Sequence, residues 1–439
     1  MHRRFQRAIA IAMGGSAAWP SYRGLLALFL LVRFFLSVGQ HLSATLGTTF
    51  TMENLRVPYG DTVAIYMIRA GAGFLASVLV STFVDRLAVF RVVQGASVIG
   101  AALRLLLAWD GGQWMPQAVQ LIIICAALPL NDALFRLAVP VALKRILAIE
   151  YANDAALEQR RRNLFVAIFY ALHNIGDIAA NLVYYRWRTL GGVVYANTGV
   201  LYPSAAALLA TAAIVTWMRY IAPRSDSPGI PLQETTHAMK SARFWRYLGT
   251  VLALVCVTSM FLHFELTLTK DLLVELGPGN PFPVLQSINP AMVFLLAAPV
   301  SWLLDRWQVG AFNALIVGTA LSASGCLAMG ILRVVPSVSA VAAYAVGLVI
   351  FSLGEVVWSP RVSSYALDVA PEGSEAFYQA VADLPNLLIV FIGPLMSHML
   401  VDTYCSDTHC NGAMIWSILG LVAACTPFLL TLTRSWIED

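Results

Sequence analysis

The feature that most constrains this chain is a series of apolar runs, each about 20 residues long, the length an α-helix needs to cross a bilayer core. Of its 439 residues 59% are hydrophobic and 12% charged, and the mean hydropathy is +0.73. A soluble protein of this composition would expose most of its apolar surface to water. No segment alternates polar and apolar residues, which disfavours a membrane β-barrel. The sequence therefore predicts an all-α membrane protein with about twelve transmembrane helices, centred near Leu31, Ala72, Gly100, Cys125, Asn174, Leu209, Cys256, Leu295, Thr319, Val346, Val390 and Leu421.

The distribution of Lys and Arg predicts the orientation of the chain. If the N-terminus is cytoplasmic, most of the 28 Lys and Arg residues fall in cytoplasmic segments, as the positive-inside rule requires. We therefore expect a multi-pass protein of the plasma membrane or an endomembrane, with both termini in the cytosol. The net charge of +4 then reflects topology and is no sign of nucleic-acid binding.

The chain divides at a polar segment with three prolines, residues 220–245, which we interpret as a cytoplasmic linker. It separates an N-terminal six-helix bundle, 24–219, from a C-terminal six-helix bundle, 246–433. A short cytoplasmic tail, 434–439, ends the chain. The basic N-terminus, 1–23, is interpreted as a cytoplasmic leader, with a weak signal or transit peptide as the alternative.

A short motif recurs in the two bundles, as internal repeats do in transporters. The second span ends in "VSTFVDRL" and the eighth in "VSWLLDRW", which places Asp85 and Arg86 at the same turn as Asp305 and Arg306. "AIFYALHNI" and "AFYQAVADL" correspond in the fifth and eleventh spans. The repeats predict two pseudo-symmetric halves. The Asp-Arg turns are either a latch between the halves or ordinary positive-inside residues.

Ionisable residues lie within the predicted spans, where each costs at least ~2.5–3.5 kcal/mol on insertion scales and normally faces a partner or a polar cavity. "LPLNDALFRLAV" and "FSLGEVVWSPRV" place Asp132 and Glu355 at equivalent positions. Asp132 and Arg136 stand one turn apart, so they either pair within their own helix or face a ligand. Arg104 lies near the outer end of its span, where it can snorkel to the surface. Glu355 has no such local partner, because Arg361 is expected at the cytoplasmic helix end.

The six cysteines give one further expectation. Cys405 and Cys410, in "YCSDTHCNG", share one outer loop and are expected to form a disulfide there. A metal site that includes His409 is a weaker alternative, because only one histidine is present in the loop.

Two stretches carry a set of motifs in a specific order. "LQSINPAMVFLLAAPVSWLLDRW", residues 285–307, has Gln-Ser-Ile-Asn-Pro followed by Ala-Pro, and "GEVVWSPRVSSYALDVAP" has Gly-Glu, Ser-Pro and Ala-Pro. They resemble the eighth and tenth helices of the proton-coupled oligopeptide transporter family of the major facilitator superfamily. "LFVAIFYALHNIGDI" is similar to its fifth helix, and "LFRLAV" to the stretch of its fourth helix that holds Lys-Pro. The resemblance implies the major facilitator fold, with a central site between the halves.

The resemblance also implies roles for individual residues. Glu355 corresponds to the glutamate that receives the amino terminus of a peptide, and Arg136 to the lysine near the peptide carboxylate. Asn174 and Asn289 correspond to amides that hold the peptide backbone. Glu265 lies near the seventh-helix acid that helps to run the gate.

The first helix departs from the family pattern. Arg33, in "VRFF", resembles the arginine of the family's Glu-x-x-Glu-Arg-Phe motif, but both glutamates are replaced, by Phe29 and Val32. The two tyrosines and the second arginine that follow in the family are replaced by Leu36, Ser37 and Gln40 or His41. The usual proton-coupling residues are therefore incomplete, and coupling would depend on Glu265, Glu355 or His41.

Together these observations predict a secondary active transporter of small polar, amine-bearing solutes, peptide-like or amino-acid-like, that works by alternating access. The alternatives are a facilitative uniporter of another small organic solute, and a receptor or scaffold that keeps the fold without transport. No Walker loop, His-Glu-x-x-His or Cys-x-x-Cys motif occurs, so neither an enzyme nor an ATP-driven pump is expected. We expect a monomer that contacts its solute and the lipid bilayer, with no cofactor beyond a coupling proton.

Overall fold

The computed structural model describes residues 22–43, 50–57, 59–109, 114–151, 155–221, 239–277, 281–406 and 409–435. These residues are almost entirely helical and contain no strand beyond one isolated bridge between Cys405 and Cys410. Twelve helices among these described residues are long and apolar enough to cross a membrane. The all-α prediction with twelve spans is confirmed, and the chain is a multi-pass membrane protein. The predicted leader lies almost wholly, and the predicted linker and tail partly, outside the described residues.

The N-terminal half contains the first six spans. Its elements are α2 (Tyr22–Leu42), η2 (Phe50–Asn54), α3 (Tyr59–Arg86), α4 (Val89–Ala108), α5 (Gln117–Ile122), η4 (Ile123–Ala127), α6 (Leu128–Glu150), α7 (Ala155–Gly199) and α8 (Leu201–Ile221). The long α7 is interrupted at Gly192, whose φ of 81° is accessible because glycine has no Cβ. The fifth span ends there, and the sixth begins at Val194 and continues through α8.

The C-terminal half contains the other six spans. Its elements are α10 (Ala242–Ala253), α11 (Val255–Glu265), α12 (Thr267–Leu276), α13 (Phe282–Arg306), α14 (Ala311–Leu332), α15 (Ala340–Val369), α16 (Glu375–Ala382), α17 (Leu384–Tyr404) and α18 (Gly412–Leu432). Two spans are broken helices: α10, α11 and α12 form the seventh, and α16 and α17 form the eleventh. The first residue of α10, Ala242, lies within the stretch predicted as linker.

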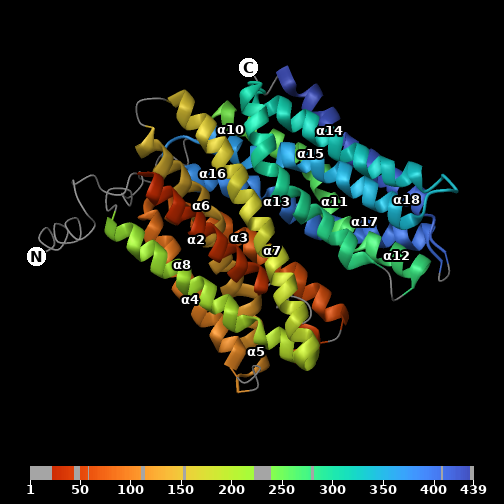
Figure 1. The fold of residues 1–439 in the computed structure, drawn as a ribbon, viewed down its shortest axis with the longest axis horizontal. Coiled ribbons are helices and arrows are strands. Elements are labelled where there is room, and N and C mark those ends of the chain that lie inside the picture. The colour runs from red at the N-terminus through yellow and green to blue at the C-terminus, as the bar shows by residue number, and fades with distance from the viewer. Residues whose placement is uncertain are drawn as a thin grey trace, which may run out of the picture.

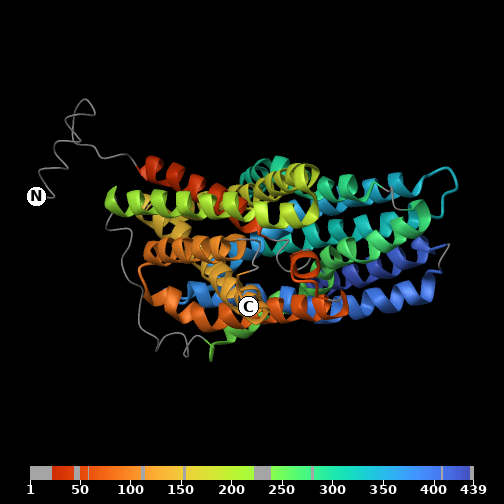
Figure 2. The same cartoon turned by 90° about the horizontal axis from the view of Figure 1, so that it is seen from below.

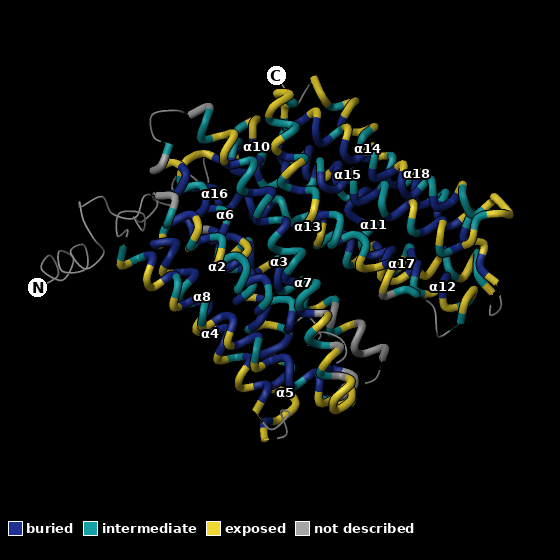
Figure 3. The backbone as a smooth tube through the Cα atoms, in the orientation of Figure 1, coloured by how far each residue is buried: buried dark blue, intermediate teal, exposed yellow. Residues whose placement is uncertain are grey.

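Each half has its own apolar core. In the N-terminal half the ring of Phe29 packs against Phe90, with 6.0 Å between the ring centroids. In the C-terminal half Phe264 packs against Phe351 and Trp416, at 4.8 and 5.7 Å. Buried residues follow the helix faces inside each half, and exposed residues follow the outer faces (Figure 3). Exposed apolar side chains on the outside suit a lipid environment.

The two halves meet near α6, α10 and α16 and diverge toward α5 in one half and α12 in the other (Figure 1). Seen from below, they lie side by side along the long axis (Figure 2). We call the end at which α8 ends and α10 begins the linker end, and the end with α5 and α12 the opposite end. Between the halves, α7 packs along α13, and α3 packs against α16 and α17. The repeats make these two interfaces equivalent, because they equate the second span with the eighth and the fifth with the eleventh.

Candidate functional site

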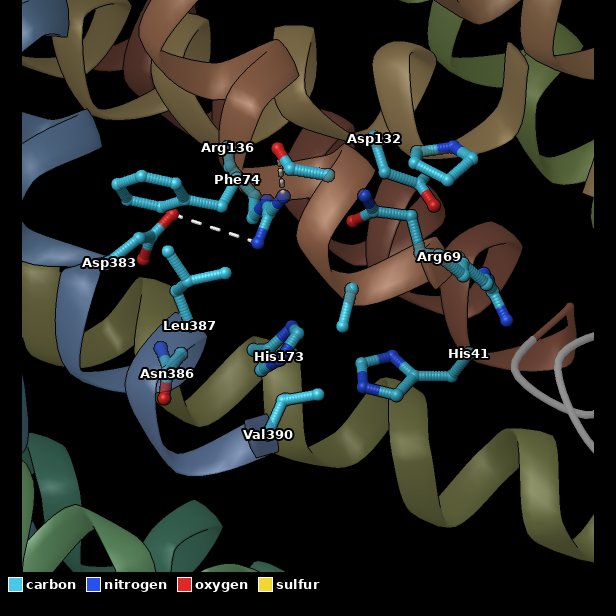
Figure 4. Close-up of a pocket in the computed structure, with 14 residues that line it drawn as sticks. His41, Arg69, Phe74, Asp132, Arg136, His173, Asp383, Asn386, Leu387 and Val390 are labelled. Carbon is cyan, nitrogen blue, oxygen red and sulfur yellow. Dashed lines mark hydrogen bonds and ion pairs between the residues drawn. The ribbon is translucent and has the colours of Figure 1, made fainter. Parts of the chain in front are cut away.

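A cavity of about 350 Å³ lies between the halves, where α3 faces α17 (Figure 4). This volume is at the small end of the range for ligand pockets, about 300–1,000 Å³. Its lining is polar and charged for a membrane interior, with apolar residues from both halves between the polar groups. The lining residues are Gln40, His41, Arg69, Ala70, Gly73, Phe74, Pro129, Asp132, Arg136, His173, Asp383, Asn386, Leu387 and Val390.

An ion pair crosses the cavity between the halves. Arg136 of α6 lies 3.7 Å from a carboxylate oxygen of Asp383, which stands at the break between α16 and α17. The same guanidinium donates to the carbonyl of Gly73 at 3.3 Å and to the hydroxyl of Ser77 at 3.4 Å. The charge of Arg136 is therefore already balanced by the other half of the molecule.

A second pair holds the other acid of the cavity. Asp132 lies 3.5 Å from Arg104, which is completely buried and donates to the hydroxyl of Ser43 and the carbonyl of Gly100. The prediction that Arg104 snorkels to the surface is therefore wrong, since helix packing encloses it. A pair between Asp132 and Arg136 within one helix is also wrong, because each finds its ion-pair partner on another helix.

Two histidines lie together in the cavity wall. The rings of His41 and His173 are 4.4 Å apart between centroids. The hydroxyl of Ser37 donates to the carbonyl of His173 at 2.8 Å and lies 3.2 Å from Nδ1 of His41. The structure thus places His41, a predicted proton-coupling residue, next to a second titratable ring.

Glu355 lies outside the cavity lining and is 2% exposed. Its carboxylate accepts hydrogen bonds from the hydroxyl of Tyr170 and the amide of Asn289. Asn289 also donates to the hydroxyl of Ser352 at 3.1 Å. Tyr170 is three residues before His173 on α7, about 4.5 Å nearer the linker end at 1.5 Å per residue. The Glu355 cluster therefore lies nearer the linker end than His173 does, and the partners of Glu355 are a phenol and an amide.

Three other predicted residues have different surroundings. Arg33 donates from Nε to the carbonyl of Phe169 at 3.1 Å, and Asn174 donates to the carbonyl of Tyr170 at 2.8 Å. Glu265 is exposed at the end of α11, close enough to Asp177 of α7 to interact electrostatically. Of the predicted site residues, the cavity brings together Arg136, Asp132 and His41, while Arg33, Asn174, Asn289, Glu265 and Glu355 lie outside its lining.

The acids of the repeated Asp-Arg turns both contact the other half at the linker end. The carboxylate of Asp85 accepts from the backbone N–H groups of Ala376 and Phe377, at 2.8 and 3.2 Å, in the first turn of α16. Asp305 accepts from the amide of Asn163 on α7 at 3.3 Å, and it pairs with Arg361 at 3.0 Å.

The arginines at the linker end have other positions or contacts than the sequence predicted. Arg361 is buried within α15, so its predicted place at the helix end is wrong. Arg306 is exposed and Arg86 is half-buried. Neither belongs to the cross-half contacts that the described residues form.

Two ion pairs add to the contacts at the linker end. Lys144 of α6 lies 2.9 Å from Glu375 of α16, and Arg162 of α7 pairs with Asp368 of α15. Lys144 also donates to the carbonyl of Leu367 at 3.2 Å. All of these contacts join the two halves, so polar groups hold the halves together at this end.

Of two residues near the site that the sequence analysis did not assign, one had a signal in the sequence and the other had none. Asp383 was visible as an acid inside an apolar run, which is costly without a purpose. Tyr170 gave no such signal, because a tyrosine in an apolar helix is common.

At the opposite end Cys405 and Cys410 form the expected disulfide, so neither is free to bind a metal.

Comparisons with known proteins identify structures with the same fold. No protein-family model matches the sequence, and no curated protein matches it. A POT family transporter solved in complex with 5-aminolevulinic acid is 16% identical, with a TM-score of 0.67 over 95% of this chain and 97% of that chain. A peptide transporter POT solved with sulfate is 15% identical, with a TM-score of 0.67 over 98% of each chain. A bacterial homologue of the iron transporter ferroportin, in an outward-facing state, is 12% identical, with a TM-score of 0.67 over 94% and 100%. At such identities the likeness shows the fold alone: this chain has the major facilitator fold of two six-helix halves that was predicted from its sequence.

Proposed function

We propose that this protein is a secondary active transporter that moves small polar, amine-bearing solutes, peptide-like or amino-acid-like, across a membrane by alternating access. The observation that carries this proposal is a charged cavity between two halves that polar contacts join at the linker end and that diverge at the opposite end. The fold likeness supports it, because the similar structures include transporters in complex with 5-aminolevulinic acid and with a thioalcohol-conjugated peptide.

The contacts at the linker end correspond to a state of the transport cycle in which this end is closed. If the positive-inside rule holds, the linker end is cytoplasmic and the cavity is reached from outside. Release to the cytosol then requires that the pairs Arg162–Asp368 and Lys144–Glu375 separate. Closure at the opposite end would accompany this separation. In this cycle we assign a latch function to Asp85 and Asp305, whose carboxylates contact the other half, with Arg86 and Arg306 next to them in the sequence.

The cavity has the groups that an amine-bearing solute needs. Asp383 and Asn386 line it on the C-terminal half and can receive an ammonium group. The solute then competes with Arg136 for Asp383, which would couple its binding to the contact between the halves. In this proposal the coupling ion is a proton, taken by His41 or Glu355, and the protein works as a monomer without enzymatic activity, in the plasma membrane or an endomembrane.

Uptake into proteoliposomes tests the proposal. A labelled dipeptide mixture is offered with and without an inward proton gradient to the wild type, Asp383→Asn and Glu355→Gln. Asp402→Asn is the matched control, because Asp402 is an exposed acid at the end of α17. We expect gradient-stimulated uptake that Asp383→Asn and Glu355→Gln reduce at least tenfold and that the control retains. Absence of uptake by well-folded wild type contradicts the proposal.

A facilitative uniporter is the second candidate, and one observation favours it. Phe29 and Val32, which stand where the family has glutamates, are completely buried in the apolar core of the N-terminal half. These positions therefore cannot supply a titratable group to the cavity. In the same assay, uptake that is indifferent to the proton gradient supports the uniporter.

A further inference from the structure

Two carboxylates line the cavity, Asp132 and Asp383, and three arginines lie in or directly behind its wall: Arg69 and Arg136 in the lining, and the buried Arg104. Arg136 is balanced by Asp383 at 3.7 Å, and Asp132 is balanced by Arg104 at 3.5 Å. These two pairs use both carboxylates that line the cavity. Arg69 is the remaining cation of the lining.

Arg69 has no acidic partner of its own. It is half-buried on α3, and it forms no ion pair with a carboxylate in the part of the chain that the structure describes. It also lies close enough to Arg104 for the two guanidinium groups to repel each other. An arginine inside a membrane protein normally faces a partner or a polar cavity, because its charge is costly there. Here the described part of the chain provides the cavity and no carboxylate partner for Arg69.

Arg69 lies apart from Arg136, the other arginine of the cavity lining. Arg136 and Asp383 lie on one side of the cavity and Arg69 on the other, with His173 between them in the view of Figure 4. On α3, Arg69 is one turn nearer the opposite end than Gly73, whose carbonyl Arg136 contacts. A solute that enters from the opposite end therefore meets an unbalanced guanidinium at one side and an acid at the other.

We propose that Arg69 binds the carboxylate of the transported solute. This inference rests on the proposed function and narrows its substrate class to zwitterions, with the ammonium group toward Asp383 and the carboxylate toward Arg69. A guanidinium suits this role, because its planar set of donors matches a carboxylate in two parallel hydrogen bonds. The assignment differs from the one that the family resemblance implies, in which Arg136 lies near the carboxylate.

Matched pairs of ligands test the role of Arg69 in the purified full-length protein. The probes are 5-aminolevulinic acid with its methyl ester, and alanyl-alanine with its C-terminal amide, with affinity measured by titration calorimetry. We expect the wild type to bind each acid at least tenfold more tightly than its uncharged counterpart. Arg69→Gln should abolish this preference, and Arg69→Lys should keep part of it.

The control removes the balanced pair as a unit, in the double variant Arg136→Gln with Asp383→Asn. It should weaken binding of both members of each ligand pair while retaining the preference for the acid. A preference that survives in Arg69→Gln, or disappears in the double variant, overturns the assignment. Size-exclusion profiles identify any variant that fails to fold.

If no probe binds, the proposed function fails for this solute class, and a second measurement decides the role of Arg69. Leu387→Cys, in the cavity wall, is introduced into a chain whose free cysteines are replaced by alanine. Its reaction rates with an anionic and a cationic methanethiosulfonate reagent are compared. We expect Arg69→Gln to lower the ratio of anionic to cationic rate about tenfold and the double variant to leave it unchanged. An unchanged ratio in Arg69→Gln refutes the inference.

Discussion

At the scale of single residues, Glu355 shows how a membrane protein holds a buried carboxylate that forms no ion pair with any described residue. Its oxygens accept from Tyr170 on the other half and from Asn289 on its own half. We predict that Tyr170→Phe destabilises the protein by about 1.5–3 kcal/mol, the usual contribution of a hydrogen bond to a charged group. Tyr202→Phe is the control, because its hydroxyl donates to a neutral carbonyl within one half, and it should cost about 1 kcal/mol or less. Thermal unfolding of the purified variants measures both, and equal midpoints for the two contradict this account.

The same residues show what a sequence can and cannot reveal at this scale. The charged residues inside the spans were visible, because each interrupts an apolar run. Their partners were not, because Asp132 pairs with Arg104 on α4 and Arg136 with Asp383 in the other half. Those pairings depend on how the helices pack, and sequence spacing suggested only the nearest neighbour. Arg361 was misplaced for a related reason, since α15 continues beyond Pro360 to Val369.

At the scale of helices, α14 and α15 pack with their backbones nearly in contact. A Cβ added at Gly325 would lie 2.5 Å from the backbone N of Phe351, and one at Gly354 would lie 2.4 Å from the backbone N of Ser322. Small residues permit such an approach between membrane helices. We predict that Gly325→Ala lowers the thermal unfolding midpoint by several degrees, because backbone atoms must move apart. Gly95→Ala is the control: nothing lies within 4 Å of its added Cβ, so the change should be neutral or stabilise α4. Similar midpoints for the two variants would show that this contact can relax.

The number of spans was predictable because each needs about 20 apolar residues. The breaks within spans were not, because hydropathy averages over them. The eleventh span is interrupted at Asp383 between α16 and α17, and the seventh at Leu254 and Leu266. The break at Asp383 positions a cavity acid, so the feature that hydropathy misses is also the one that builds the site.

At the scale of the whole molecule, the two interfaces between the halves that the repeats make equivalent differ in the side chains that form them. The interface of α7 with α13 is packed mainly with apolar side chains such as Ala167 and Val293, and its hydrogen bonds join Asn163 to Asp305 and Ser301 at the linker end. The interface of α3 with α16 and α17 contains the cavity and the contact of Asp85 with the first turn of α16. The two hydrogen bonds to Asp85 hold the first turn of α16 against α3, so they must break before α16 can move away. We therefore expect the opening motion to occur mainly at the polar interface.

Removal of the Asp85 carboxylate should shift the balance between the two conformations. Asp85→Ala deletes two hydrogen bonds that exist when the linker end is closed, and each 1.4 kcal/mol lost changes the population ratio about tenfold. Spin labels at the exposed positions Leu87 and Trp307 report the width of the linker end, and labels at Ile122 and Val334 report the opposite end. In double electron–electron resonance, we expect the first distance to lengthen and the second to shorten in Asp85→Ala, while Asp402→Asn changes neither. Unchanged distances would mean that the ion pairs of Lys144 and Arg162 hold the linker end closed without Asp85. A lengthening at the linker end alone would mean that the halves do not move as rigid bodies about the cavity.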